Sequence, residues 1–253
     1  MERLFHADQK REDLPELYYN EFLELAVHDL DAPLRKLILL TERLDEKCNM
    51  LLLPNELHPY LERISNCAQN MRSLIDDLYT LTNINKQPSD FEVCNLDDLM
   101  QDVLQQLKNT LDERKAKVRV GQLPIVEGNK HLLKMLFKNL LLNAVIFTEE
   151  TSAPEITIQS SETSKAKRNE LPLKEEIIYY QVDIKDNGIG FNKDDSEKIF
   201  NPFVSLHGKS RSGGNGMGLA ICHKIISMHE GVVYAEPNEG KGATFTFLIP
   251  QTH

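Results

Sequence analysis

Residues 186–190 read Asp-Asn-Gly-Ile-Gly and residues 213–218 read Gly-Gly-Asn-Gly-Met-Gly, and these two glycine clusters decide how the chain divides. Ten of the twelve glycines lie after residue 185, whereas the first 120 residues contain none. Glycine is needed where the backbone takes a positive φ or approaches a ligand closely. We therefore expect a front of long helices and a glycine-rich back that binds a phosphate-bearing ligand.

The front carries the clearest periodic pattern of the chain, over residues 60–86. The apolar positions of this pattern are Leu61, Ile64, Ala68, Met71, Ile75 and Leu78. Their spacing is that of an a/d heptad seam and predicts a helix. A second helix is expected over residues 14–47, interrupted by Pro33, which usually kinks a helix. Residues 48–59 are expected to connect the two helices into an antiparallel hairpin.

One hairpin buries little apolar surface by itself. We expect two copies to pair as a four-helix bundle in a symmetric dimer. The alternative is a hairpin that packs on the downstream domain of its own chain. Residues 87–89, Gln-Pro-Ser, end the second helix, so the predicted domains are residues 1–88 and 89–253.

The sequence after residue 89 mixes helix and strand patterns without regular alternation. The expected helices cover residues 95–115, 129–147 and 220–229, and the expected strands cover residues 118–121, 155–160, 177–185, 232–236 and 243–249. The polar residues 161–176 are expected to form an exposed loop. The fold class is therefore α+β, with one sheet covered by helices on one face.

Composition excludes several classes of function. The net charge is −10, which argues against binding to nucleic acid or to anionic lipid. No apolar run approaches 18 residues, so we expect no membrane segment, and the charged start does not resemble a signal peptide. The four cysteines lack metal-ligand spacing and fit a reducing cytoplasm.

Two elements of the back could bind a nucleotide. Asp186 follows an apolar strand, and a buried carboxylate there could accept a hydrogen bond from an amine such as that of adenine. Gly214, Gly216 and Gly218 lead into a helix, and backbone N–H groups before a helix N-terminus bind anions. Each cluster could instead be a plain structural turn.

Two further elements could act on the bound ligand. Asn143 follows Asn139 by one helical turn, and its carboxamide is a plausible single Mg²⁺ ligand, although a helix–helix hydrogen bond would also explain it. His28 could be a nucleophile, with Asp29 holding its tautomer or taking its proton. A solvated helix histidine is the alternative.

The order of these elements resembles the catalytic core of two-component sensor histidine kinases, from about residue 20 to residue 250. The stretches similar to the H, N, G1, F and G2 boxes of that family are Val27–Leu34, Asn139–Thr148, Asp186–Gly190, Ile199–Phe203 and Gly214–Leu219. Leu206–Lys209, Gly216–Ile225 and the closing Gly240–Pro250 are similar to the bacteriophytochrome-like branch.

The resemblance implies a dimerisation and histidine-phosphotransfer hairpin followed by an α/β sandwich of the GHKL ATPase type. It implies an ATP-dependent protein-histidine kinase that phosphorylates His28, with Asp29 as the base. The phosphoryl group would then pass to an aspartate in the receiver domain of a response regulator. ATP and Mg²⁺ are the implied cofactors.

The resemblance also assigns a role to each residue of the nucleotide site. Asn143 would hold Mg²⁺ with Asn139 near the phosphates, and Asp186 would read the adenine amine with water-mediated support from Thr244. Lys209 and Arg211, in the lid, are the candidate cations for the phosphate charge. The other residues expected to bind the nucleotide are Phe147, Gly188, Gly190, Phe203, Gly214, Gly216, Gly218 and Leu219.

The chain departs from the family pattern at two positions. Ile146 occupies a position where the family usually has a lysine that meets the phosphates, so ATP binding or turnover is expected to be weaker unless Lys209 or Arg211 compensates. Ala32 lacks the polar group with which some relatives orient a water, so we expect weak phosphatase activity. Two other functions stay open: a non-catalytic dimeric scaffold that binds nucleotide, and an ATPase gated by dimerisation, against which the His28 hairpin argues.

Overall fold

The computed structural model describes residues 30–31, 34–48, 58–84, 91–164, 171, 173–174, 176–206, 216–238 and 242–252. Internal contacts divide the chain into two compact units, Met1–Asn83 and Ile84–His253. Within the described residues no helix is both long and apolar enough to cross a membrane.

The first unit is a pair of packed helices. Residues 34–48 are helical, and α2 spans His58–Asn83. The core between the two helices consists of Leu34, Ala68 and Ile75, with Ile38 and Leu78 packed against it. This packing confirms the predicted helical hairpin, while most of the predicted connection lies outside the described residues.

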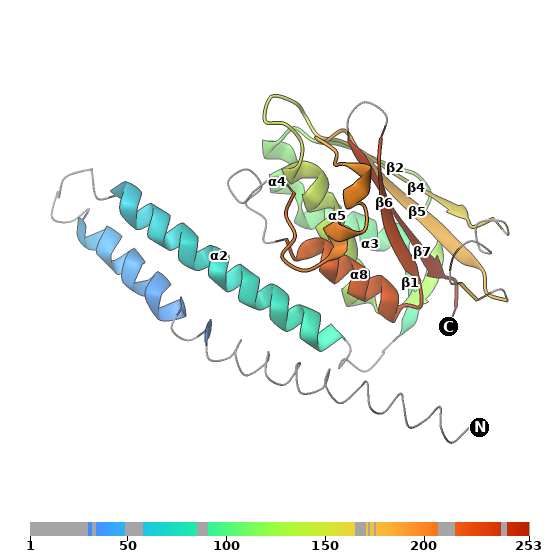
Figure 1. Ribbon diagram of the computed structural model, residues 1–253, viewed down its shortest axis with the longest axis horizontal. Helices are drawn as coiled ribbons and strands as arrows, with labels where there is room; N and C mark the ends of the chain where they lie inside the picture. The colour runs from blue at the N-terminus through green and yellow to red at the C-terminus, as the bar shows by residue number, and fades with distance from the viewer. Residues whose placement is uncertain are drawn as a thin grey trace, which may run out of the picture. The chain divides into compact units, whose positions relative to one another are not determined.

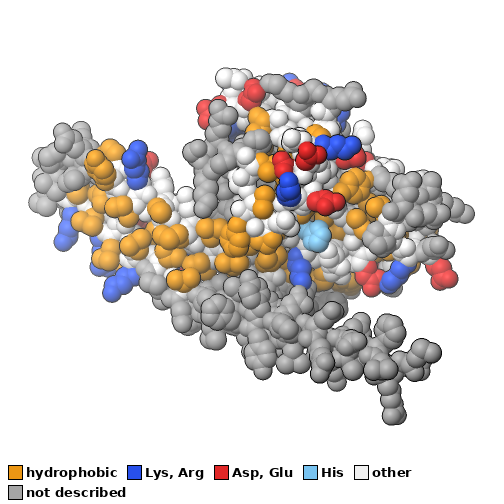
Figure 2. Space-filling view, in the orientation of Figure 1, with side chains coloured by type: hydrophobic (Ala, Val, Ile, Leu, Met, Phe, Trp, Pro, Cys, Tyr) orange, Lys and Arg blue, Asp and Glu red, His pale blue; other side chains and the backbone are white. Residues whose placement is uncertain are grey.

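The heptad seam of α2 is only partly buried within one hairpin. Ala68 and Ile75 are 0% and 6% exposed, whereas Ile64 and Met71 are 47% and 40% exposed. Figure 2 shows hydrophobic side chains gathered along the hairpin. Among the described residues of this unit, the exposed large apolar side chains are Leu30, Leu37, Leu39, Leu40, Leu44, Tyr60, Ile64, Met71 and Tyr79. The hairpin alone therefore buries two of the six heptad positions, leaves Leu61 and Leu78 partly buried, and leaves Ile64 and Met71 exposed.

The second unit is an α+β sandwich, as predicted. Across its five-stranded sheet the order is β2 (Lys117–Val120), β4 (Glu155–Glu162), β5 (Tyr179–Asp186), β7 (Ala243–Pro250) and β6 (Val232–Pro237). Only the β2–β4 pair is parallel. The helices α3 (Leu96–Gln106), α4 (Lys108–Glu113), α5 (Lys130–Ile146) and α8 (Gly218–Met228) cover one face (Figure 1).

The alternation of side chains along β5 places Asp186 under the helices. Val182 and Ile184 are fully buried, and Val182 pairs across the sheet with Phe247. Phe247 makes an edge-to-face contact with Phe137 of α5, at 5.7 Å between ring centroids. Because residues two apart in a strand share a face, Asp186 lies on the same helix-covered side.

The structure corrects three details of the predicted elements. The helix expected over residues 95–115 is divided at Leu107, where ψ is 3° and α3 ends. A small antiparallel sheet of β1 (Glu92–Asn95) and β3 (Ile125–Gly128) was not expected, because four-residue strands carry little periodicity. The start of the expected loop at 161–176 belongs to β4, because pairing with β5 outweighs its polar composition.

Candidate nucleotide site

Asp186 presents a buried carboxylate at the end of β5, where only 7% of the residue is exposed. Its Oδ1 accepts the backbone N–H of Gly188 at 2.8 Å and that of Ala243 at 3.1 Å. Burial raises the pKa of Asp186 above its usual value, and the two hydrogen bonds oppose this rise. Oδ1 is thus held in place, and within the described residues Oδ2 makes no hydrogen bond.

The glycines around Asp186 stand where a side chain has no room. A Cβ on Gly188 would lie 2.8 Å from the carbonyl oxygen of Phe147. Gly190 has a φ of +67°, and its Cβ would lie 2.9 Å from the carbonyl oxygen of Gly242. Glycine therefore lets this loop pack between the end of α5 and the turn before β7, which builds a wall beside Asp186.

A cavity of about 80 Å³ lies against Asp186. The lining residues are Asn143, Phe147, Asp186, Gly190, Phe191, Ile199, Val204, Ser205, Leu206, Leu219, Ala243 and Phe245. Five of these were predicted site residues: Asn143, Phe147, Asp186, Gly190 and Leu219. A mostly apolar slot with a carboxylate in its wall suits the edge of a planar base that carries an amine.

Asn139 lies beside the first residue of α8. A Cβ on Gly218 would lie 3.8 Å from Asn139 Cγ, which is ordinary van der Waals contact. Asn139 Nδ2 is buried, and no hydrogen-bond partner for it exists in the described part of the chain. Asn139 is therefore close to a helix N-terminus, where backbone N–H groups can bind an anion.

Thr244 does not line the cavity. Its hydroxyl donates to Asn238 Oδ1 at 2.7 Å, and Asn238 Nδ2 donates to the backbone oxygen of Asp186 at 3.4 Å. Thr244 pairs with Lys185, so strand alternation places its side chain on the face opposite to Asp186. The backbone N–H of Ala243 donates to the Asp186 carboxylate, whereas the Thr244 side chain makes no direct hydrogen bond to it.

Phe203 also stands apart from the cavity. It is 57% exposed and has a φ of +65°. Gly216, with a φ of +69°, packs against the same segment, since a Cβ there would lie 2.9 Å from the carbonyl carbon of Phe203. The remaining predicted residues, His28, Asp29, Lys209, Arg211 and Gly214, lie outside the described residues.

Sequence reasoning missed most of the apolar walls. Phe191, Val204, Leu206, Ala243 and Phe245 line the cavity and were not expected there. Their only signal is their closeness in sequence to Asp186–Gly190, Ile199–Phe203 or the last strand. Apolar side chains of this kind are indistinguishable from core residues until the tertiary packing is known.

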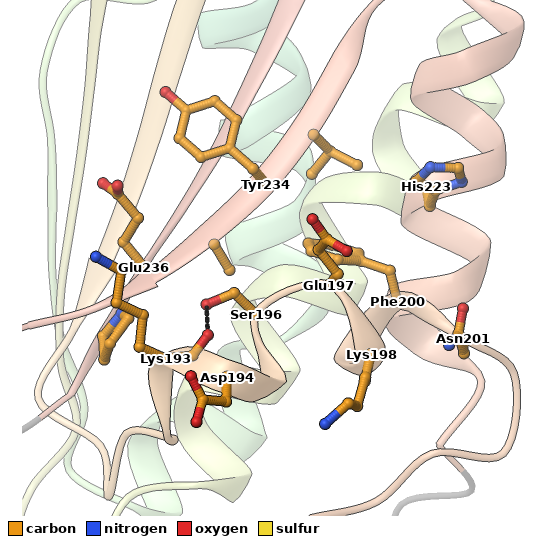
Figure 3. Close-up of a pocket in the computed structure, with 13 residues that line it drawn as sticks. Lys193, Asp194, Ser196, Glu197, Lys198, Phe200, Asn201, His223, Tyr234 and Glu236 are labelled. Atoms are coloured by element: carbon orange, nitrogen blue, oxygen red, sulfur yellow. Dashed lines mark hydrogen bonds between the residues drawn. The ribbon is translucent and has the colours of Figure 1, made fainter.

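A second and larger cavity, of about 930 Å³, lies along the edge strand β6 (Figure 3). Two short 3-10 helices, η2 (Lys193–Asp195) and η3 (Lys198–Phe200), form its other wall. Its lining includes lysine and glutamate side chains together with His223, and none of the predicted site residues. Charges of both signs do not favour the binding of a polyphosphate, so the smaller cavity is the better candidate for a nucleotide site.

Asn143 could supply one oxygen ligand to a magnesium ion. No group of three or more histidine, cysteine or acidic side chains that could hold a metal exists among the described residues. Asn143 lines the cavity, and its side chain makes no hydrogen bond within the described part of the chain. Mg²⁺ characteristically takes one or two protein oxygens and completes its shell with water and phosphate. The residues present therefore fit a Mg²⁺ ion that arrives with a nucleotide.

Two family models match the chain. The model described as "His Kinase A (phospho-acceptor) domain" matches residues 19–87. The model described as "Histidine kinase-, DNA gyrase B-, and HSP90-like ATPase" matches residues 128–253. The first range contains His28, and the second contains every described residue of the cavity.

Known proteins are similar to the chain over most of its length. It is 30% identical to the phytochrome-like protein Cph1 of Synechocystis, over 91% of this chain and 29% of that protein. It is 28% identical to the sensor histidine kinase WalK of Bacillus subtilis, over 91% of this chain and 36% of that protein. The chain thus spans about a third of the length of these relatives.

Solved structures share the fold. Full-length ShkA in complex with AMPPNP has a TM-score of 0.67 and 20% identity, over 92% of this chain and 46% of that chain. The catalytic domain of the histidine kinase ThkA has a TM-score of 0.52 and 26% identity, over 64% of this chain and 97% of that chain.

Proposed function

Since this chain belongs to the histidine kinases, with their phospho-acceptor domain at residues 19–87 and an ATPase domain of the kind they share with DNA gyrase B and HSP90 at residues 128–253, we propose that it transfers the γ-phosphoryl group of ATP to its own His28. The cavity beside Asp186 carries this proposal. It joins a fixed buried carboxylate, an apolar slot and a glycine-led helix N-terminus in one unit. A phospho-acceptor region precedes that unit in the same chain, as the reaction requires.

Asp186 accepts a hydrogen bond from the exocyclic amine of adenine at Oδ2, the carboxylate oxygen that has no partner in the described residues. Phe147, Leu219 and Phe245 supply the apolar faces of the slot. A base that lacks the amine leaves the carboxylate unpaired in a buried site, which is costly. This chemistry favours adenine over guanine nucleotides.

Asn143 supplies the protein ligand of a Mg²⁺ ion, which neutralises phosphate charge when bound. Asn139 and the backbone N–H groups at the start of α8 face the phosphates. Lys209 and Arg211 provide further positive charge from the lid. Transfer of a phosphoryl group depends mainly on such positioning and charge stabilisation.

In the transfer step a ring nitrogen of His28 forms a bond to the γ-phosphorus. The bond from that phosphorus to the β–γ bridging oxygen breaks, and ADP leaves. Asp29 takes the ring proton or holds the tautomer that leaves one nitrogen free. The phosphoryl group then passes to an aspartate in the receiver domain of a response regulator.

The acceptor hairpin works as a homodimer in this proposal. The exposure of Ile64 and Met71 supports it, because a second hairpin would bury apolar side chains that one hairpin leaves in water. A domain boundary near residue 88 would separate the phospho-acceptor hairpin from the nucleotide-binding domain. One of the similar solved structures, at 20% identity, is ThkA in complex with the response regulator protein TrrA. That complex supports the class of partner proposed here.

The experiment is incubation of the purified chain with γ-labelled ATP and Mg²⁺. Wild type and His58→Ala are expected to gain label that is acid-labile and alkali-stable, while His28→Ala gains none. His58 is a matched control, because it is the histidine of α2 and pairs with Asp45 at 2.8 Å.

Other outcomes would replace the proposal. Nucleotide binding without label on the wild type would indicate a non-catalytic scaffold. Steady phosphate release that survives His28→Ala would indicate an ATPase of the gyrase or chaperone kind.

A further inference from the structure

Ser205 carries a buried hydroxyl that none of the predicted roles uses. It lines the cavity that contains Asp186. Its Oγ is buried and has no hydrogen-bond partner within the described residues. Buried polar atoms without partners are uncommon in folded proteins, and one inside a binding cavity suggests a partner that arrives with the ligand.

The position of Ser205 indicates which part of a nucleotide it meets. Asp186 marks the base end of the cavity, and the start of α8 at Gly218 marks the phosphate end. Ser205 follows Val204, whose carbonyl oxygen would lie 2.8 Å from a Cβ on Gly216. Gly216 is two residues before α8. Ser205 therefore lies in the wall that leads from the base to the phosphates.

We propose that the Ser205 hydroxyl donates a hydrogen bond to an oxygen at the junction of the ribose and the α-phosphate. The inference rests on the proposed nucleotide function and adds a residue that governs affinity. Oxygen is the acceptor at this junction in both the sugar and the phosphate. A serine donates to either without adding charge.

This role makes an uncommon prediction about stability. Without nucleotide the hydroxyl is buried and has no partner among the described residues, so its removal by Ser205→Ala is expected to cost nothing and can stabilise the fold. With nucleotide bound, the same change removes a hydrogen bond. A purely structural serine would show the reverse pattern, with lost stability and unchanged affinity.

The test measures adenosine, AMP and ADP binding by calorimetry for the wild type, Ser205→Ala and Ser196→Ala. Ser196 is the matched control, because its hydroxyl donates to the backbone oxygen of Lys193 and does not line the cavity that contains Asp186. We expect Ser205→Ala to weaken AMP and ADP binding by about two- to tenfold. Its unfolding temperature should equal or exceed that of the wild type, and Ser196→Ala should bind normally.

The three ligands separate the two acceptors. Equal weakening for adenosine assigns the bond to the ribose, and weakening for AMP and ADP alone assigns it to the α-phosphate. If Ser205→Ala binds each of the three ligands within twofold of the wild-type affinity, the role of Ser205 is overturned and the nucleotide site is not. A wild type that binds no adenine ligand overturns the nucleotide site and the inference together.

Discussion

The imidazole of His229 accepts the backbone N–H of Asn129 at Nε2, with 3.0 Å between the two nitrogens. Nδ1 therefore carries the proton, and it donates to the carbonyl oxygen of Ile225 at 2.7 Å. His229 is 0% exposed, and the ring of Phe91 stacks on it at 4.9 Å. Because Asn129 caps α5 and His229 follows α8, one neutral histidine joins the two helices that carry the site.

His229→Ala should destabilise the second unit without touching the cavity. The change leaves a buried N–H of Asn129 unpaired and removes a stacked ring, so we expect a loss of about 2–4 kcal/mol in the free energy of unfolding. Urea unfolding measures it. His223→Ala on the exposed face of the same helix is the control, with an effect of less than about 1 kcal/mol. A loss that small in His229→Ala would contradict the role of His229 as a link between the helices.

Asp186→Asn should separate stability from binding. The amide oxygen of asparagine can still accept the N–H groups of Gly188 and Ala243, and the cost of a buried charge disappears. We expect unchanged or higher stability together with ADP binding that is weaker by about tenfold or more, because the adenine amine loses its charged acceptor. Calorimetry and thermal unfolding on the same samples test this. Normal ADP affinity in Asp186→Asn would exclude the carboxylate as the base-reading group.

The raised pKa of Asp186 predicts a pH dependence of known sign. In the folded state the carboxyl keeps its proton to a higher pH than in the unfolded state, where the value is near 3.8. Between these two values the folded state binds more protons, so the Asp186 contribution to the free energy of unfolding falls as pH rises. Asp186→Asn should therefore gain stability relative to the wild type as the pH rises from about 3.8 to the folded pKa of Asp186. A difference between the two proteins that is constant with pH would contradict this.

ADP affinity should change in the opposite direction with pH. Only the ionised carboxylate is a full acceptor for the adenine amine, so the affinity should rise as Asp186 ionises. The rise should be absent in Asp186→Asn. Titrations of both proteins over the acidic range in which they stay folded measure this.

Gly242→Ala should be far more damaging than Gly218→Ala. A Cβ on Gly242, at a φ of +95°, would lie 2.1 Å from the backbone oxygen of Asp186, so strand β7 or the site must move. We expect a loss of about 2 kcal/mol or more in the free energy of unfolding. Gly218 has only ordinary contacts and begins a helix, so alanine there should be neutral or stabilising by up to about 1 kcal/mol. Equal effects in urea unfolding would contradict the packing argument.

The sequence predicted the features that have a period or a steric requirement. The heptads of α2 predicted the hairpin, the alternation before Asp186 predicted a strand, and the glycines predicted close backbone approach. The sequence could not predict which face of β7 would meet the cavity. The resemblance gave Thr244 a water-mediated role beside Asp186, whereas the direct hydrogen bond to that carboxylate comes from the backbone N–H of Ala243. The apolar walls and the His229 link depend on tertiary contacts across about a hundred residues, for which local patterns carry no signal.

Ile146→Lys should strengthen the binding of nucleotides with longer phosphate chains. Ile146 is the last residue of α5, lies three residues after Asn143 and is 37% exposed, so a lysine there needs no buried volume. A cation at a helix C-terminus is also favourable. We expect ATP and ADP affinity to rise by about two- to tenfold at low salt, and the gain to shrink as salt screens the charge.

The control for this change is Ile146→Gln, which adds length and polarity without charge and should leave affinity near that of the wild type. Adenosine has no phosphate, so its binding should respond to neither variant. Equal gains for adenosine and ATP, or a gain that does not depend on salt, would mean that position 146 acts on the base pocket through Phe147 and not on the phosphates.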